Sequence, residues 1–212
     1  METKNIAMTW LFEILFPRYV WRIKTSDKKI YLTFDDGPIP EVTAWVLDEL
    51  KKYNAKATFF VVGENVKRNS EIFQKILTEG HHVGNHTQNH IRGWSKDTDT
   101  YLANFQECQN SILELKPSST NLFRPPYGQI KRLQANEILK THKVLMWSVL
   151  TRDYDFDLDA QQCLNNAINR TEPGSIVLFH DSLKAQKNLY YVLPRFLKHF
   201  SKKGFEFCTI EL

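Results

Sequence analysis

The 212-residue sequence predicts an α/β protein built as a single distorted, incomplete (β/α)7-type barrel. Short segments rich in β-branched and aromatic residues alternate with longer segments in which apolar residues recur every three or four positions. This pattern indicates a parallel sheet with helices outside it. The strand segments are apolar at almost every position, as expected for strands buried on both faces. A complete eight-unit barrel takes about 250 residues, so a barrel of this length must be a trimmed one.

The expected elements follow one another without a linker or an internal repeat. The first strand, at 29–34, is followed by the turn-forming pair Gly37-Pro38. The longest helix, at 98–115, stops before Pro117, a residue that cannot continue it. The other strands are expected at 57–62, 82–85, 122–123, 143–149, 175–179 and 205–210, and the other helices at 41–53, 64–79, 130–139, 158–169 and 189–200.

Residues 1–28 are expected to form a helical extension packed on the barrel, which itself takes 29–212. No run approaches the ~20 apolar residues of a membrane span, so no stable span is expected, and a helix lying on a membrane surface is the second interpretation. The extension has no cationic leader or small-residue cleavage site, so it is a poor signal peptide and the default location is the cytoplasm. Its apolar residues at helical spacing are Trp10, Leu11, Ile14 and Leu15.

The charge of the chain excludes one class of partner. The 28 Lys and Arg residues exceed the 24 Asp and Glu residues by four, and the basic residues are scattered as short pairs. A nucleic-acid-binding protein concentrates its basic residues in a patch or stripe, so no nucleic-acid partner is expected. The sequence contains no indication of the oligomeric state.

Polar residues follow the C-terminal ends of the expected strands. They are Asp35, Asp36, His86, Arg124, Asp153 and His180. In a parallel barrel these strand ends share one rim, which is where active sites are built. The sequence therefore predicts a functional site at this rim.

His86 and His90 are four residues apart, a spacing at which two imidazoles on a helical turn can bind one metal ion. The neighbouring carboxylates of Asp35 and Asp36 repel each other, so their joint burial requires a nearby cation. One of them could complete a His-His-Asp metal site while the other remains free as a base. From the residues alone, the alternative is a hydrogen-bonded loop with two ordinary histidines and a turn aspartate.

His180 and Arg124 complete the set. A histidine at the end of an apolar strand is poorly explained as a core residue, because a buried imidazole needs hydrogen-bond partners. Arg124 is followed by Pro125 and Pro126, which fix the backbone and so can hold a backbone N–H in a set direction.

Together these elements resemble the five motifs of the polysaccharide deacetylases, the NodB-homology enzymes of carbohydrate esterase family 4. The motifs occur in the family's order, at 33–37, 86–90, 124–128, 147–154 and 178–180. The resemblance covers nearly the whole chain and makes 29–212 a NodB-homology domain. It implies a metal-dependent hydrolase that removes acetyl groups from N- or O-acetylated sugars of a polysaccharide such as peptidoglycan or a chitin-like glycan. Such a substrate favours the cell envelope as the location.

The resemblance also implies the ligands of a cofactor. By position, Asp36, His86 and His90 would bind a divalent metal ion, expected to be zinc, with cobalt and nickel as alternatives. Leu178 would line a pocket for the acetyl methyl group. Four aromatic side chains lie on loops beside the motifs and either stack on sugar rings or pack between loop and barrel: Trp94, Tyr127, Tyr154 and Phe156.

Catalytic roles are implied in the same way. Asp35 would be the general base, oriented by Arg124, and His180 the general acid. The backbone N–H of Tyr127 would help to bind the oxyanion that forms during hydrolysis.

The fourth motif departs from the family pattern, Asp-x-x-Asp-Trp, in which the first Asp supports the acid histidine. Leu150 takes the first position and Tyr154 replaces Trp, while Asp153 keeps the second position. We therefore expect Asp153 to support His180 or Arg124.

Two other functions stay open at this point. One is a hydrolase of the same fold that acts on a non-carbohydrate amide or cyclic imide. The intact Asp35-Asp36 pair and the Arg-Pro-Pro-Tyr segment favour the sugar-specific branch over it. The second is a catalytically impaired glycan-binding homologue, which only the loss of an acid at Leu150 supports.

Overall fold

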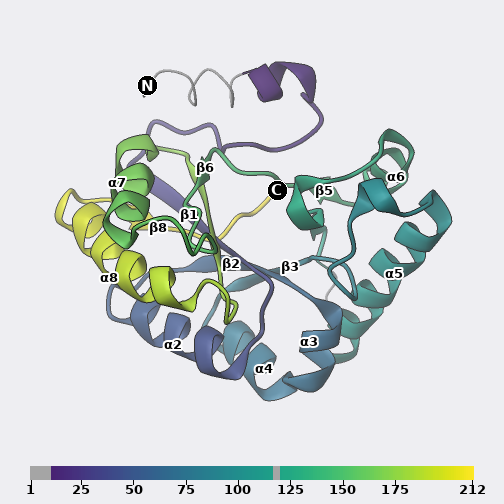
Figure 1. Ribbon diagram of the computed structural model, residues 1–212, viewed down its shortest axis with the longest axis horizontal. Helices are drawn as coiled ribbons and strands as arrows, with labels where there is room; N and C mark the ends of the chain where they lie inside the picture. Colours follow the sequence, from purple (N-terminus) through teal and green to yellow (C-terminus); the bar gives the residue numbers. More distant parts are fainter. Residues whose placement is uncertain (1–10, 117–119) are drawn as a thin grey trace.

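A curled, all-parallel sheet forms the centre of the molecule (Figure 1). In this computed structural model, which describes residues 11–116 and 120–212, the strand order is β5-β4-β3-β2-β1-β7-β6, with β8 paired to β1. The strands are β1 (Lys29–Asp35), β2 (Ala57–Val61), β3 (His82–Asn85), β4 (Leu122–Phe123), β5 (Lys143–Val144), β6 (Val149–Leu150), β7 (Ile176–His180) and β8 (Glu206–Phe207). β5 and β6 stand at opposite ends of this order, so the barrel is open between them. The predicted distorted, incomplete barrel is confirmed.

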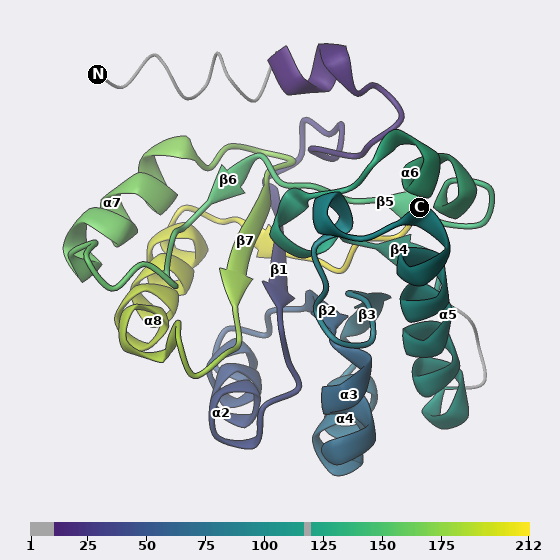
Figure 2. The ribbon, with the colours of Figure 1, turned by 45° about the vertical axis from the view of Figure 1, so that its right-hand side comes forward.

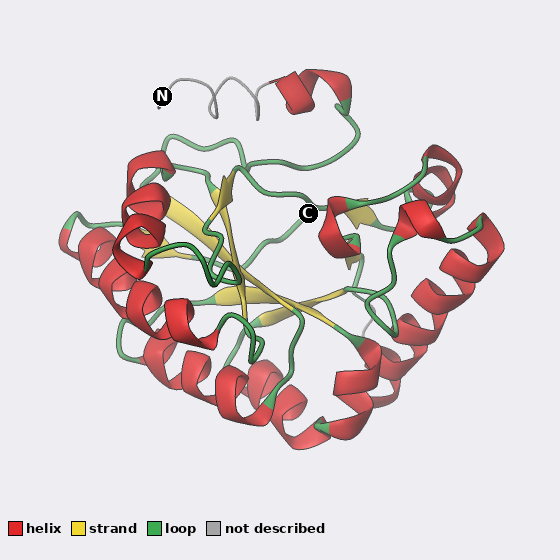
Figure 3. Cartoon of the chain, viewed as in Figure 1, coloured by secondary structure: helices red, strands yellow, loops and turns green. Residues whose placement is uncertain are grey.

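Helices surround the outer face of the sheet (Figure 3). They are α2 (Pro40–Lys51), α3 (Gly63–Arg68), α4 (Ser70–Thr78), α5 (Thr98–Leu115), α6 (Arg132–Ile138), α7 (Ala160–Arg170) and α8 (Gln186–Lys202), with 3-10 turns η1 (Gly93–Ser95) and η2 (Pro126–Gly128). The helix expected at 64–79 is two helices, α3 and α4. The break falls at Asn69, whose backbone is non-helical and whose side-chain amide donates to the Pro38 carbonyl oxygen at 2.9 Å.

Strand β1 sends its side chains alternately to the helices and to the barrel interior. Ile30, Leu32 and Phe34 belong to the large apolar core between the sheet and the helices. Thr33 and Asp35 lie on the other face, where both accept hydrogen bonds from one buried arginine. This alternation places a carboxylate at the interior end of β1 without exposing the apolar face of the strand.

The single strand expected at 143–149 is wrong. This segment forms two short strands, β5 and β6, that pair with β4 and β7 respectively. Between them, the carbonyl oxygens of Leu145 and Met146 accept hydrogen bonds from the Arg124 guanidinium, at 3.3 and 2.8 Å. Because each backbone carbonyl must be satisfied, carbonyls that serve a side chain interrupt the ladder between strands. The interruption coincides with the open side of the barrel.

Residues 11–15 form a short helix outside the sheet, near the top of Figure 1. Phe12 stacks on Trp21 with ring centroids 5.7 Å apart, and Glu13 pairs with Arg22 at 3.0 Å. These two contacts join the helix to the rest of the chain. All four of its apolar residues are exposed, Leu11, Phe12, Ile14 and Leu15, and Trp10 lies outside the described residues.

The next segment of the extension crosses the open side of the barrel. The Val20 N–H donates to the Val144 carbonyl at 2.9 Å, and the Met146 N–H donates to the Val20 carbonyl at 2.8 Å. Three residues later, the Ile23 N–H donates to the Gly174 carbonyl at 2.9 Å. The extension thus links the β5 edge to the start of β7. Within the described ranges, no helix is both long and apolar enough to span a membrane.

Candidate active site

The residues predicted for the site gather at the carboxyl ends of the strands. Figure 2 shows β1 and β7 side by side and running in one direction, and their register pairs Asp35 with His180. His86 follows β3 and Arg124 follows β4, and these two strands are also neighbours. Parallel pairing therefore brings side chains that are distant in the sequence to one rim.

Three of these residues form a cluster that can hold a metal ion. Asp36, His86 and His90 each offer one ligand atom, and the three atoms lie within 4.8 Å of one another. Asp36 Oδ1 is 3.2 Å from His90 Nε2 and 3.9 Å from His86 Nε2. This oxygen is buried and has no hydrogen-bond partner among the described residues. A buried carboxylate oxygen without a donor is expensive unless a cation satisfies it, so the cluster fits a divalent metal ion.

The imidazole of His86 is oriented as a metal ligand. Its Nδ1 lies 2.7 Å from the backbone carbonyl oxygen of Arg124. Because a carbonyl can only accept, Nδ1 carries the hydrogen and Nε2 presents its lone pair to the cluster. Burial of the ring, assisted by the charge of His90, lowers the pKa of His86 well below its usual value. The ring therefore stays neutral, which is the form that binds a metal.

The two histidines do not lie on a helical turn, contrary to the expectation from their spacing. Residues 86–90 form a non-helical loop, in which Thr87 and His90 have φ angles of 65° and 53°. Asp36, the third member of the cluster, also has a positive φ, 89°. Such backbone costs roughly 1–3 kcal/mol per residue and persists where the surrounding structure enforces it. The ligands converge through strained loops instead of helical geometry.

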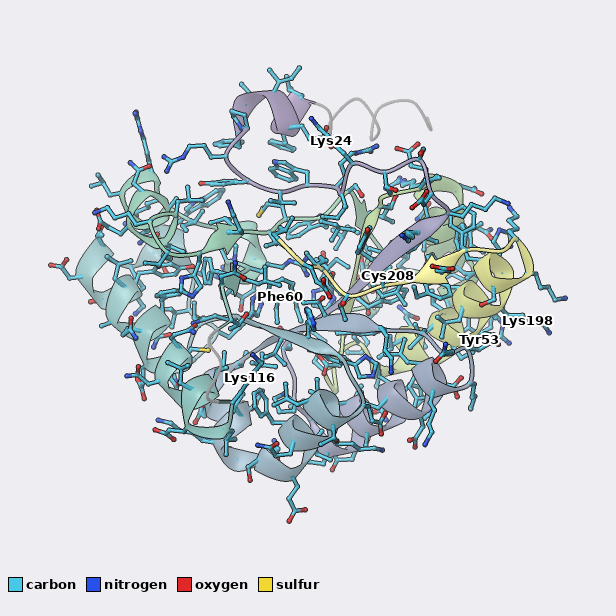
Figure 4. The ribbon with its side chains drawn as sticks, turned by 180° about the vertical axis from the view of Figure 1, so that it is seen from behind. Lys24, Tyr53, Phe60, Lys116, Lys198 and Cys208 are labelled. Atoms are coloured by element: carbon cyan, nitrogen blue, oxygen red, sulfur yellow. The ribbon has the colours of Figure 1, made fainter. Side chains whose placement is uncertain are left out.

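Asp35 is held by a fully buried arginine. Arg124 Nη1 lies 2.7 Å from Asp35 Oδ1 and also donates to Thr33 Oγ1 at 2.9 Å. The guanidinium carbon lies 4.2 Å from the centroid of Phe60, which is labelled in Figure 4. With the two carbonyl acceptors described above, the guanidinium makes four hydrogen bonds, one of them to a carboxylate, which makes the burial of this charge tolerable. The other oxygen, Asp35 Oδ2, lies 3.7 Å from His86 Nε2 and faces the metal cluster.

His180 has a carboxylate partner of its own. Asp153 Oδ1 lies 2.8 Å from His180 Nδ1, and Asp153 Oδ2 accepts the backbone N–H of His180 at 2.7 Å. Burial lowers the pKa of His180, but the Asp153 carboxylate outweighs it and raises the pKa to about 9. Of the two partners expected for Asp153, the structure places it on His180. His180 therefore has a carboxylate partner although position 150 is a leucine.

The residues expected to contact substrate differ in their distance from the cluster. The Tyr127 ring is half exposed and lies 4.6 Å from the His90 ring. The Tyr127 backbone has φ 59°, and its N–H is the first backbone donor after the Pro-Pro pair. The Tyr154 ring meets His180 edge-on at 4.9 Å, and Leu178 is buried two residues before His180 in β7. Of these side chains, Tyr127 and Tyr154 directly contact the expected ligands or acid.

Trp94 lies on η1 beside this group. Its ring is 62% exposed, and its indole N–H donates to the carbonyl oxygen of Ile130 at 3.3 Å. The acceptor of this hydrogen bond is neither a residue of the metal cluster nor one of the two proton-transfer candidates, Asp35 and His180. The role of Trp94 in substrate binding stays a prediction.

Asp181, directly after His180, is a buried carboxylate that holds the turn after β1. The side chain is fully buried, and it accepts hydrogen bonds from the Gly37 N–H at 3.0 Å and from Thr43 Oγ1 at 2.6 Å. Burial raises the pKa of Asp181 to about 7. A Cβ on Gly37 would lie 1.9 Å from the Asp181 carboxylate, so only glycine fits there. An Asp at the end of a strand is also common in ordinary turns, so its sequence position alone does not identify this buried role.

Comparisons with known proteins agree with this geometry. A model of the polysaccharide deacetylase family matches residues 22–145. A peptidoglycan-N-acetylglucosamine deacetylase of Bacillus cereus is 34% identical over 196 residues, covering 90% of each chain. The peptidoglycan-N-acetylglucosamine deacetylase PgdA of Listeria monocytogenes is 34% identical over 88% of this chain, which spans only 39% of that longer relative. The crystal structure of the Bc1960 peptidoglycan N-acetylglucosamine deacetylase superposes with a TM-score of 0.87 at 30% identity, covering 94% of each chain. The chain belongs to the polysaccharide deacetylase family.

Proposed function

We propose that this protein is a metal-dependent deacetylase that hydrolyses the acetamido group of N-acetylglucosamine residues in a glycan, with peptidoglycan as the favoured polymer. One observation carries the proposal: the Asp36, His86 and His90 cluster adjoins two proton-transfer candidates, Asp35 and His180, that are register partners on neighbouring strands. Each candidate has its own ionic partner. The names of the two relatives and of the solved structure support N-acetylglucosamine in peptidoglycan as the substrate.

The cluster favours zinc as the cofactor. Two imidazole nitrogens and one carboxylate oxygen form a common catalytic zinc set that leaves a position open, and cobalt or nickel accept the same donors. When bound, such an ion polarises a carbonyl group and lowers the pKa of water. The remaining work falls to the side chains around it.

Asp35 removes the proton from the attacking water. Its Oδ1 is occupied by Arg124, whereas Oδ2 faces the metal cluster 3.7 Å from His86 Nε2. The guanidinium cannot give up its proton under ordinary conditions, so it fixes Asp35 without competing for the proton that Asp35 accepts. The carboxylate is thus positioned as a general base.

His180 donates a proton to the departing amine. Its Nδ1 is held by Asp153, which leaves Nε2 for the substrate. Without an acid, the leaving group would be an amide anion, which is far too basic to depart readily. The Tyr127 N–H stabilises the negative oxygen that develops in between, an interaction worth ~3–4 kcal/mol in a comparable hydrolase.

The proposal is tested by acetate release from peptidoglycan, from N-acetylated chito-oligosaccharides and from an O-acetylated glycan. The chain is assayed after removal of metal by a chelator and after addition of Zn²⁺, Co²⁺ or Ni²⁺. Activity is expected on an N-acetylated glycan, to disappear without metal and to return with it. Asp35→Asn and His180→Ala are expected to abolish it, whereas the controls Asp27→Asn and His199→Ala, which lie outside the rim, are expected to retain it.

Other outcomes contradict the proposal. Full activity in both Asp35→Asn and His180→Ala would remove the assigned base and acid. Turnover of a cyclic imide with no acetate from any glycan would favour the amidase alternative. Glycan binding by the metal-loaded chain with no acetate release would favour an impaired, glycan-binding homologue.

A further inference from the structure

Helix α5 holds the loop that joins the two histidines of the metal cluster. The side-chain oxygen of Asn104 accepts hydrogen bonds from the backbone N–H groups of Gln88 and Asn89, at 3.0 and 3.2 Å. Its side-chain nitrogen donates to the side-chain oxygen of Asn89 at 2.8 Å. One side chain therefore makes three hydrogen bonds to two consecutive residues, both of which lie between His86 and His90.

The two histidines are held in different ways. The side chain of His86 is 2% exposed, and its Nδ1 is bonded to the Arg124 carbonyl. The side chain of His90 is 29% exposed, and beyond the His86 ring its contacts run to Asp36 and to the Tyr127 ring. Within the described residues, no backbone carbonyl forms a hydrogen bond with the His90 ring. The place of His90 in the cluster therefore depends on the backbone of the loop.

That backbone is strained, and the hydrogen bond across it, from the Ile91 N–H to Thr87 Oγ1, is long at 3.3 Å. Thr87 and His90 have left-handed φ angles, 65° and 53°, which residues with side chains rarely adopt. An unrestrained loop would relax toward ordinary φ values. Because His90 is itself one of the strained residues, such a relaxation would move its ring away from the other two ligands.

Two helices, α3 and α5, supply most of the hydrogen bonds that the loop receives from outside itself. At the start of α3, the N–H groups of Gly63 and Glu64 donate to the carbonyl oxygens of Thr87 and Gln88, at 3.1 and 3.0 Å. On the amide side of the loop, the Thr87 N–H donates to Asn85 Oδ1 at 2.8 Å, whereas the next two residues depend on Asn104, through its side chain and, for Gln88, also through its backbone carbonyl at 3.1 Å. The side chain of Asn104 thus accepts the amide hydrogens of the two residues in the middle of the loop, Gln88 and Asn89.

We propose that Asn104 is a positioning residue that sets the affinity of the metal cluster by holding His90 against His86 and Asp36. The proposal rests on the proposed metal-dependent function. It assigns Asn104 no contact with metal or substrate. Residues that orient metal ligands typically contribute about 10–100-fold to metal affinity, and a loss in that range is expected for Asn104→Ala.

The test measures metal binding to the metal-free 212-residue chain. Zn²⁺ affinity is determined by competition with a chelator, and the Co²⁺ absorption spectrum reports the geometry of the ligands. Asn104→Ala is expected to bind Zn²⁺ about 10–100-fold more weakly and to alter the Co²⁺ spectrum. Asn104→Asp keeps an oxygen that can accept both amide bonds, so most of the affinity should return. Asn110→Ala is the matched control, because Asn110 is an exposed residue of the same helix, bonded to Gln106, and should bind both ions like the wild type.

An unchanged Zn²⁺ affinity and Co²⁺ spectrum in folded Asn104→Ala would overturn the proposal and leave the proposed function intact. If that variant does not fold, Asn104→Leu decides, since it fills a similar volume without an acceptor. Wild-type affinity in Asn104→Leu would overturn the proposal as well. A wild-type chain that binds neither ion would overturn the metal-dependent function together with this inference.

Discussion

Two carboxylate–cation pairs lie at the candidate active site. In one pair the cation supports the carboxylate, and in the other the carboxylate supports the cation. In the Asp35–Arg124 pair, 2.7 Å apart, the carboxylate faces the metal cluster and the cation is the buried support. In the Asp153–His180 pair, 2.8 Å apart, the carboxylate is the buried support and the imidazole is the group proposed to meet the substrate. The same kind of ion pair therefore holds the proposed general base on one strand and the proposed general acid on the next.

The difference lies in which partner can titrate. Arg124 keeps its charge at any working pH, so the first pair is a permanent one. His180 changes charge within the accessible pH range, and Asp153 raises its pKa to about 9. The first pair should therefore respond to mutation mainly in stability, and the second mainly in pH dependence. The variants below test this division.

The largest effect is expected for Arg124→Met. Breaking a buried ion pair from one side leaves Asp35 buried without its counter-charge, which typically costs about 3–5 kcal/mol. The carbonyls of Leu145 and Met146 also lose their donor. The free energy of unfolding in urea should fall by this amount, and deacetylase activity should be lost. Arg124→Lys keeps the charge but not the planar fork, so it should recover only part of the stability.

The opposite result would be informative about the break between β5 and β6. Stability within about 0.5 kcal/mol of the wild type, the range of ordinary surface substitutions, would show that Arg124 does not hold the two strands. It would also remove the distinction between a structural and a titrating pair.

Asp153→Asn should lower turnover in a chain that still folds. The amide keeps the size of the side chain and can still accept a hydrogen bond, but it does not stabilise the charged imidazole. A general acid contributes about 10²–10⁴-fold to a rate, and a loss within this range is expected for kcat. In the wild type, activity should fall as the pH rises through about 9, where His180 loses its proton. In the variant, this alkaline limb should move toward the ordinary value of 6.5. An alkaline limb that does not move would show that Asp153 does not set the pKa of the proposed acid, His180.

The same pair predicts a pH dependence of stability in the metal-free chain. The folded-state pKa of His180, about 9, is higher than its ordinary value of 6.5. The resulting stabilisation is complete below pH 6.5 and is lost as the pH rises through about 9. At 1.36 kcal/mol per pKa unit, it amounts to about 3 kcal/mol at most. Urea unfolding of the metal-free wild type and Asp153→Asn at pH 6 and pH 9.5 should show their stabilities converging at the higher pH. Parallel curves would contradict the prediction.

The positions of the cluster and of the proton-transfer residues could be predicted because parallel strands end at one rim. His86 and Arg124 each follow a strand and His180 ends one, and the topology brings those strands together. The break in 143–149 could not be predicted in this way. It depends on the Arg124 side chain, which reaches that segment from a different strand, and a local hydrophobic pattern contains no such information.

The shape of the loop at 86–90 escaped prediction for a related reason. The spacing of two histidines suits a helical turn, but the loop is held in left-handed conformations by hydrogen bonds from α3 and α5. Asn104 lies well beyond the loop in sequence and has no motif of its own. Its contribution becomes visible only when the helix is packed against the loop.

The smallest effect is expected for Leu150→Asp, which restores the acid that the family pattern has in its fourth motif. The register of β6 pairs Leu150 with Leu178, two residues before His180 on β7. Nδ1 of His180 is already bonded to Asp153, so a carboxylate at 150 has no vacant donor to engage on that nitrogen. Turnover and the alkaline limb of the pH profile should stay near those of the wild type, and Leu150→Asp should not rescue Asp153→Asn. A rescue in the double variant would show that a carboxylate at 150 can reach His180, and that the support of the acid depends on charge near the ring more than on the geometry of the present pair.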